Sequence, residues 1–348
     1  MTVAVTGIGI VHPLAATVDE LAGVEVGCVA GLRARLTDGT EVAAGTVEDL
    51  DTRARAVGCP RLGRLDRIAR LFLLASHRAV ESRGGLDGIP PDRRGILFGT
   101  GLGCLLSNEA YHRALALDGP SKVSPTTFAQ TVSNAAAGEA SIQFGVEGPN
   151  ATLLSAGCAG ADAIGEGAAT IARGEARVVL AGGGDALAAP LLNALARLGV
   201  LPNANLVPAE GAAVLVLEPL FFADPARLHG AFDGYAAAFV PDPTDEEALA
   251  ATLRGLRDRV GRVVGERVYA ARGGLAEPSV ERACARAFPD APVEFVDRRI
   301  GETFGASGAF AAAVALADAR REGGRARVLI ASFSYTGNVS LLAFRGPR

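Results

Sequence analysis

Short runs of β-branched and other apolar residues alternate along the chain with longer segments in which apolar residues recur every three or four positions. The short runs predict strands over Val3–Thr6, Gly95–Phe98, Val178–Ala181, Ala213–Glu218, Val268–Ala271, Val293–Val296 and Val328–Phe333. The longer segments predict helices over Leu65–Arg83, Leu249–Val260, Val280–Phe288 and Ala306–Arg320. Strands that alternate with helices predict an α/β fold with mixed or parallel sheets. Because no low-complexity linker separates the two parts, we expect one compact unit of two α/β halves.

Composition narrows the class of protein. The 348 residues carry a formal net charge of −4, which argues against nucleic acid or an anionic membrane as partner. The segment from Met1 to Gly7 has neither the basic start nor the apolar core of a signal peptide, and no apolar stretch is long enough to span a membrane. The five cysteines form no C-x-x-C pair. We therefore expect a cytoplasmic protein.

Several common motifs are incomplete. The dinucleotide fingerprint that Gly7 and Gly9 begin has His12 where its third glycine is required. The single lysine, Lys122, follows Ser121, which excludes a phosphate-binding loop. No metal is expected, because no two histidines stand at ligand spacing among His12, His77, His112 and His229.

A series of landmarks between Val5 and Ala309 is more specific. In order, the chain shows Val5–Val11, Ser124–Phe128, Ser133–Gly138, Gly148–Asn150, Ser155–Gly160, Ala163–Gly165, Ala181–Gly183, Glu210–Ala212, Gly301 and Gly305–Ala309. This order and spacing resemble the β-ketoacyl synthases of the thiolase-like superfamily, over almost the whole chain. The resemblance implies a layered αβαβα body made of an N-terminal half, residues 1–220, and a C-terminal half, residues 221–348.

The resemblance also implies where catalytic residues would stand. Condensing enzymes use a cysteine nucleophile at a strand-to-helix turn, two histidines and commonly a lysine. Here the nucleophile position falls on Gly157, the histidine positions on Arg272 and Glu302, and the lysine position near Asp297. No histidine follows His229 and no lysine follows Lys122, so the second half supplies neither in any alignment register.

Two features of this altered site have alternative readings. Cys158 stands one residue after the nucleophile position and is expected to be a small buried apolar residue; the alternative is a nucleophile on a shifted turn. Arg272 and Glu302 are expected to form an ion pair across the former active site, with Asp297 and Arg298 or Arg299 joining it. The alternative is that these are ordinary surface charges.

Within the family, the chain resembles the chain length factors of type II polyketide synthases. This resemblance implies a non-catalytic subunit that pairs with an active ketosynthase through a central strand, the one near Ala151–Ser155 or its neighbour. The subunit would shape the acyl tunnel during elongation on acyl carrier protein. It implies no cofactor of its own, since the phosphopantetheine of the carrier protein would reach the partner. The alternatives are a Cys158-dependent acyltransferase or condensing enzyme, and a homodimeric thiolase-fold relic.

The family resemblance places an acyl pocket beside a helix near Cys104–Leu117 and a loop over Ser124–Gln130. Helical spacing puts Leu105, Asn108, His112 and Leu115 on one face, with Tyr111 at its margin. Thr127 and Phe128 are expected between the tunnel and the partner. Asn108 and His112 would end an apolar tunnel, because burying them without partners costs about 1–3 kcal/mol each. The alternative is that Asn108 caps a neighbouring backbone group.

Overall fold

The computed structural model describes residues 1–58, 64–199, 201, 206–261, 266–275, 277–324 and 326–347. Its centre is a ten-stranded mixed sheet with the order β10-β9-β11-β12-β8-β1-β7-β6-β4-β5. The strands are β1 (Val3–Val11), β4 (Arg94–Gly99), β5 (Asn150–Leu153), β6 (Val178–Asp185), β7 (Gly211–Pro219), β8 (Gly230–Phe239), β9 (Arg267–Ala271), β10 (Val293–Phe295), β11 (Arg327–Phe333) and β12 (Asn338–Arg345). A separate hairpin joins β2 (Arg33–Arg35) to β3 (Glu41–Ala43).

The strand order repeats in the two parts of the chain. Strands β5, β4 and β6 are parallel neighbours, followed by antiparallel β7 and β1. Strands β10, β9 and β11 are parallel neighbours, followed by antiparallel β12 and β8. The two sets join only where Val3–Val5 of β1 pairs with Gly230–Phe232 of β8. Each set therefore forms one sheet of a doubled α/β architecture.

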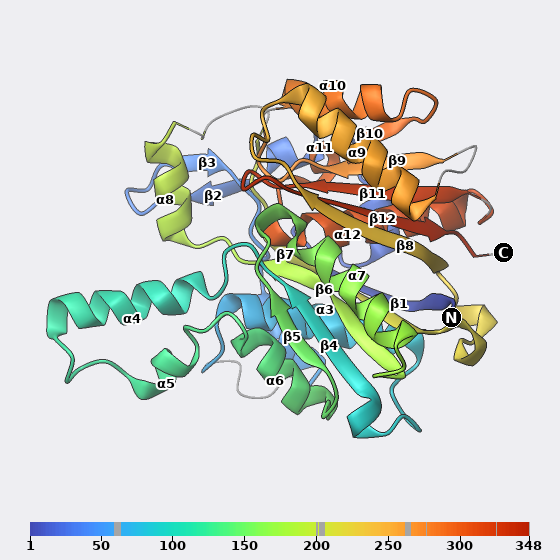
Figure 1. Ribbon diagram of the computed structural model, residues 1–348. Coiled ribbons are helices and arrows are strands. Elements are labelled where there is room, and N and C mark those ends of the chain that lie inside the picture. The colour runs from blue at the N-terminus through green and yellow to red at the C-terminus, as the bar shows by residue number, and fades with distance from the viewer. Residues whose placement is uncertain are drawn as a thin grey trace.

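Helices form three layers around these sheets (Figure 1). The helices are α1 (Val18–Ala22), α2 (Leu50–Ala56), α3 (Arg67–Arg83), α4 (Leu105–Asp118), α5 (Pro125–Ala129), α6 (Ala135–Phe144), α7 (Ala159–Ala172), α8 (Ala189–Arg197), α9 (Glu246–Val260), α10 (Glu277–Ala287), α11 (Asp297–Ile300) and α12 (Ser307–Arg321). Apolar residues of α7 and α12 share the central core between the sheets. Helices α3 and α6 cover the outer face of the first sheet, and α9 and α10 cover that of the second. This is the layered αβαβα arrangement of thiolase-like folds.

Helix α3 shows how sequence sets one of these layers. Asp66 caps its first turn by accepting a hydrogen bond from the N–H of Ile68, and Gly84 ends it with φ 94°. The helix lies so close to β1 that a β-carbon on Gly9 would stand 2.1 Å from the carbonyl oxygen of Ala75. Glycine in β1 therefore permits the contact between this helix and the sheet.

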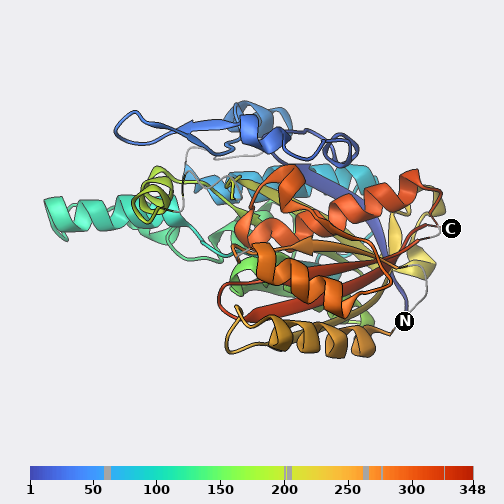
Figure 2. The same ribbon diagram turned by 90° about the horizontal axis from the view of Figure 1, so that it is seen from above.

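One region differs from the expectations, whereas the helix expected near Cys104–Leu117 is present as α4 (Leu105–Asp118). The segment Ser124–Gln130, expected as a loop, contains the short helix α5. Helix α4 projects from the body, and none of its residues is buried (Figure 2).

In the described part of the chain, no helix has the length and apolar character needed to cross a bilayer.

Candidate functional site

Gly157, the residue expected at the family nucleophile position, lies in a tight turn between β5 and α7. Ala156 adopts φ 49° at this turn, an uncommon conformation for a residue with a side chain. A β-carbon on Gly157 would lie 2.3 Å from the carbonyl oxygen of Phe333 and 2.8 Å from the α-carbon of Gly273. The backbone of the second half thus occupies the space that a nucleophilic side chain would need.

Cys158 points away from this space. Its side chain is fully buried, and its Sγ donates hydrogen bonds to the carbonyl oxygens of Asn338 at 3.2 Å and Ser332 at 3.4 Å. Burial, with the nearby Asp162 carboxylate, raises the pKa of the Cys158 thiol far above its usual range. The thiolate needed for nucleophilic attack is strongly disfavoured here.

Arg272 and Glu302 are both buried, so they are not the ordinary surface charges of the alternative reading. The expected ion pair between them is wrong: Arg272 instead pairs with Asp297, its Nε donating to Oδ2 at 2.6 Å. Glu302 accepts hydrogen bonds from backbone N–H groups and a hydroxyl rather than from Arg272. The donors are Gly274 N at 3.0 Å, Phe304 N at 2.7 Å and Ser307 Oγ at 2.9 Å.

The two flanking arginines also have other partners. Arg298 forms an ion pair with Glu281, and Arg299 with Glu294 and Asp318.

Burial and the charge of Asp297 together raise the pKa of Glu302 to about 7. The site therefore contains a carboxyl group that titrates near neutral pH.

Asp185, which the sequence pattern did not single out, joins three segments behind the same site. Its Oδ2 accepts hydrogen bonds from Gly101 N at 2.9 Å and Gly305 N at 2.6 Å, and its Oδ1 accepts from Leu102 N at 3.0 Å and from Thr100. Burial raises its pKa to about 6, although these hydrogen bonds oppose the shift. In the sequence, the feature that could have identified Asp185 is its position directly after the three glycines of β6.

A cavity of about 200 Å³ remains in front of the closed nucleophile position. Its walls are mainly glycine and apolar side chains, and its one charged lining residue among those described is Glu302. The lining residues are Gly101, Leu102, Ala156, Gly157, Leu195, Leu206, Gly273, Gly274, Glu302, Phe304 and Tyr335. In this region the described residues form no cluster of potential metal ligands. The cavity offers apolar contact and one carboxyl group, but neither cysteine nor histidine.

The predicted acyl-pocket residues lie on the projecting α4 and on α5. Asn108 Nδ2 donates to the carbonyl oxygens of Cys104 at 2.9 Å and Thr131 at 2.8 Å, which is the capping role considered as its alternative. Tyr111 contacts the ring of Phe128, at 5.5 Å between centroids, and His112 is exposed. Leu115 and Phe128 are exposed by 38% and 56%. Leu105 and Thr127 are partly buried. These side chains therefore do not enclose a tunnel within the single chain.

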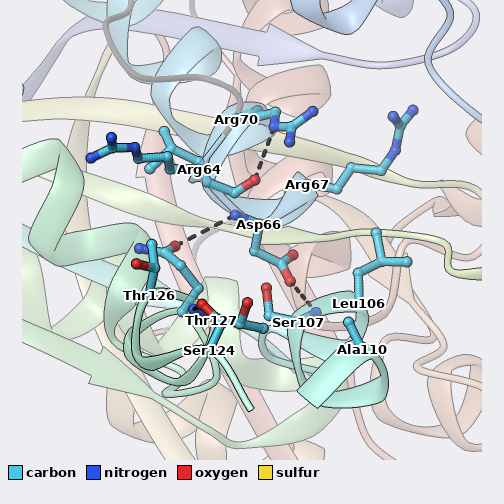
Figure 3. A pocket seen from close by; sticks show the side chains of 12 residues that line it. Arg64, Asp66, Arg67, Arg70, Leu106, Ser107, Ala110, Ser124, Thr126 and Thr127 are labelled. Atoms are coloured by element: carbon cyan, nitrogen blue, oxygen red, sulfur yellow. Dashed lines mark hydrogen bonds between the residues drawn. The ribbon is translucent and has the colours of Figure 1, made fainter. Parts of the chain in front are cut away.

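The opposite side of α4 borders a second, more polar cavity of about 440 Å³ (Figure 3). Leu106, Ser107 and Ala110 of α4 face residues that begin α3 and residues around α5 across it. Asp66 connects two of these elements, because its Oδ2 accepts a hydrogen bond from Ser107 N at 2.8 Å. The polar lining makes this cavity unsuitable for a hydrocarbon chain.

Strand β5 is the free edge of the first sheet, and exposed apolar side chains lie directly after it, on α6 and in the segment before α6. Leu154, directly after β5, is 63% exposed, and Ile142 on α6 is 71% exposed. Val132 and Phe128 are also exposed, by 47% and 56%. An open strand edge with exposed apolar neighbours is typical of a surface that pairs with another chain.

Comparison with solved structures shows the same fold at low sequence identity. The ishigamide ketosynthase/chain length factor matches with a TM-score of 0.84 and 21% identity, covering 100% of both chains. A type II polyketide synthase acyl carrier protein in complex with its ketosynthase matches with a TM-score of 0.82 and 23% identity over 99% of both chains. A β-ketoacyl synthase from Burkholderia phymatum STM815 matches with a TM-score of 0.81 and 20% identity, covering 100% of both chains.

Curated relatives match at somewhat higher sequence identity than these solved structures. The 3-oxoacyl-[acyl-carrier-protein] synthase 2 of Synechocystis is 29% identical over 62% of this chain, and the match spans only 58% of that protein. The enzyme of the same name from Coxiella burnetii is 26% identical over 82% of this chain and 76% of its own length. Residues 1–223 match the family model for the N-terminal domain of β-ketoacyl synthases. The chain therefore belongs to the β-ketoacyl synthase family.

Proposed function

We propose that this chain is a non-catalytic ketosynthase-like subunit of the chain length factor type. The observation that carries the proposal is the closed nucleophile position, where Phe333 O leaves no room for a side chain on residue 157. The lack of any histidine after His229 and of any lysine after Lys122 removes the groups that would stabilise the thioester enolate. The family reaction therefore needs its catalytic residues from another chain.

The free edge of β5 supports pairing with an active ketosynthase in a heterodimer. In this arrangement a strand of the partner would continue the sheet, and Leu154, Ile142 and Phe128 would be buried against it. Two of the structural neighbours carry the names of ketosynthase assemblies of polyketide synthesis, one of them with its acyl carrier protein. The carrier protein would deliver its phosphopantetheine to the partner's active site.

The same surface is proposed to complete the acyl tunnel. On α4, His112 and Leu115 are exposed, and Leu105 and Tyr111 are only partly buried. With the exposed Phe128 of α5, these side chains would meet the partner. Asn108 holds the turn around Thr131 in place, so its role in the tunnel would be to fix the α4–α5 geometry. Thr127 would lie at the junction of α5 with the partner.

Two rivals have less support. A Cys158-dependent acyltransferase would need a thiol that is accessible and acidic, whereas Cys158 is fully buried with a raised pKa. A homodimeric thiolase-fold relic would use the same β5 edge, but would pair with a copy of itself. Assembly therefore distinguishes this rival from the heterodimer.

The decisive experiment is co-expression with a ketosynthase that retains its cysteine and histidines, taken from the same gene neighbourhood. Native mass spectrometry should show a 1:1 heterodimer, and intact-mass analysis after incubation with acyl carrier protein should find the acyl group on the partner only. Leu154→Arg should abolish assembly, whereas Phe221→Arg should not, because Phe221 is equally exposed (69%) but follows β7. A homodimer or a thioester on this chain would refute the proposal.

A further inference from the structure

One buried carboxyl group lines the 200 Å³ cavity, and other buried charged groups lie behind its wall. Glu302 lines the cavity, and Asp185 binds the backbone N–H of the lining residue Gly101. Arg272 precedes the lining residue Gly273 and forms an ion pair with Asp297. Among the described residues, neither Glu302 nor Asp185 has an ion-pair partner. The cavity wall therefore holds one carboxyl group, that of Glu302, with which no basic side chain of the described residues forms an ion pair.

Two carboxylate oxygens keep unused capacity to accept hydrogen bonds. Asp297 Oδ1 is buried without any hydrogen-bond partner, because Arg272 donates to Oδ2. Glu302 Oε2 accepts one hydrogen bond, from Gly274 N, although a carboxylate oxygen can accept two. Of these two residues only Glu302 lines the cavity, so its Oε2 is the acceptor that a donor bound there could reach.

The rest of the lining indicates what kind of donor fits. Leu102, Leu195 and Leu206 provide apolar contact, while the rings of Phe304 and Tyr335 also line the cavity. Aromatic rings attract organic cations through their π faces, and an ammonium group has three hydrogen-bond donors. Its positive charge would also balance the carboxylate of Glu302.

We propose that this cavity binds a primary alkylammonium ion, with the ammonium group beside Glu302 and the short alkyl chain against the leucines. A longer or branched amine would exceed the space, because about 200 Å³ lies below the usual volume of drug-sized pockets. The site is formed by this chain alone. Ligand binding at this site does not depend on pairing with a ketosynthase. If no amine binds, the proposed function is therefore unaffected.

Isothermal titration of the full-length protein with n-hexylammonium chloride and with n-hexanol tests the proposal. The two probes share a chain and differ in the head group, so their difference reports the carboxylate. We expect the ammonium ion to bind about tenfold more tightly than the alcohol, as for a charge-assisted hydrogen bond. Glu302→Gln should abolish this preference while hexanol affinity stays within about twofold. The matched control Glu166→Gln changes an exposed glutamate and should keep the preference for the ammonium ion over the alcohol.

Two further measurements locate the site. Leu206→Trp should fill the cavity and abolish binding of both probes. A crystal structure of the wild-type protein with n-hexylammonium should place the ammonium nitrogen within hydrogen-bond distance of Glu302. Because this measurement uses the wild type, it tests the site even if a variant fails to fold. Equal affinity for the two probes, a preference that survives in Glu302→Gln, or a nitrogen located elsewhere would overturn the proposal.

Discussion

A β-carbon on Gly157 would lie 2.3 Å from the carbonyl oxygen of Phe333, closer than side-chain carbons approach backbone oxygens. Restoring the family nucleophile by Gly157→Cys should therefore force β11 away from the turn without restoring acyl transfer. We expect a loss of about 1–3 kcal/mol in the free energy of unfolding, as for overpacked cores. Urea denaturation measures this loss, and intact-mass analysis with acyl carrier protein tests for a thioester. A stable variant that becomes acylated would contradict the expectation.

Cys158 should be chemically inert in the folded protein. Its thiol is fully buried with a raised pKa, whereas Cys28 is exposed. Brief treatment with iodoacetamide at neutral pH should label Cys28 and leave Cys158 unmodified until denaturant is added, as peptide mass spectrometry can show. Cys158→Ala should keep product formation in the reconstituted complex. Rapid native labelling of Cys158 would instead support the acyltransferase rival.

The buried pair of Arg272 and Asp297 should be sensitive to the loss of one member only. Asp297→Asn removes a buried carboxylate that pairs with the buried Arg272 guanidinium and should cost about 3–5 kcal/mol of unfolding free energy. The double variant Arg272→Met/Asp297→Leu should be markedly more stable than this single variant, because it removes both charges together. Urea denaturation of the three proteins tests this. A double variant no more stable than Asp297→Asn would contradict the expectation.

Glu302 should make stability decrease as pH rises. Its pKa is raised from 4.5 to about 7 in the folded state, so the folded protein retains a proton that the unfolded chain loses. Between these pH values the wild type should lose about 3 kcal/mol of unfolding free energy relative to Glu302→Gln. Asp185, with its pKa raised to about 6, acts in the same direction in both proteins and cancels in the comparison. A difference that grows in favour of the wild type with rising pH would contradict this.

His112 should influence product length in the reconstituted complex if α4 borders the tunnel. His112→Ala would remove a polar group from the tunnel's end and should lengthen the product, whereas His112→Trp should shorten it. The matched control is Arg113→Ala, since Arg113 pairs with Glu109 on the same helix and is exposed. Mass spectrometry of the products decides, provided that native mass spectrometry shows intact assembly. Unchanged lengths in both His112 variants would place the gate elsewhere.

Sequence patterns predicted the strands rich in β-branched residues and the long amphipathic helices. Predicted Leu65–Arg83 and Leu249–Val260 correspond to α3 (Arg67–Arg83) and α9 (Glu246–Val260). Strand β8 was not predicted, because its sequence GAFDGYAAAF lacks the β-branched residues that favour strands. It forms because β12 pairs with it along its length, and this contact is non-local.

The sequence by itself determined what chemistry is missing, because a residue type absent from half of the chain cannot be supplied by any fold of that half. The absence of histidine after His229 and of lysine after Lys122 is of this kind. Tertiary structure alone decided which charged residues meet: Arg272 lies against Asp297 rather than Glu302 because β9, α11 and the turn after it converge there. It also decided that Asn108 bonds Thr131 O and that β5 is a sheet edge. Such choices depend on distances between residues far apart in the chain, which residue periodicity does not encode.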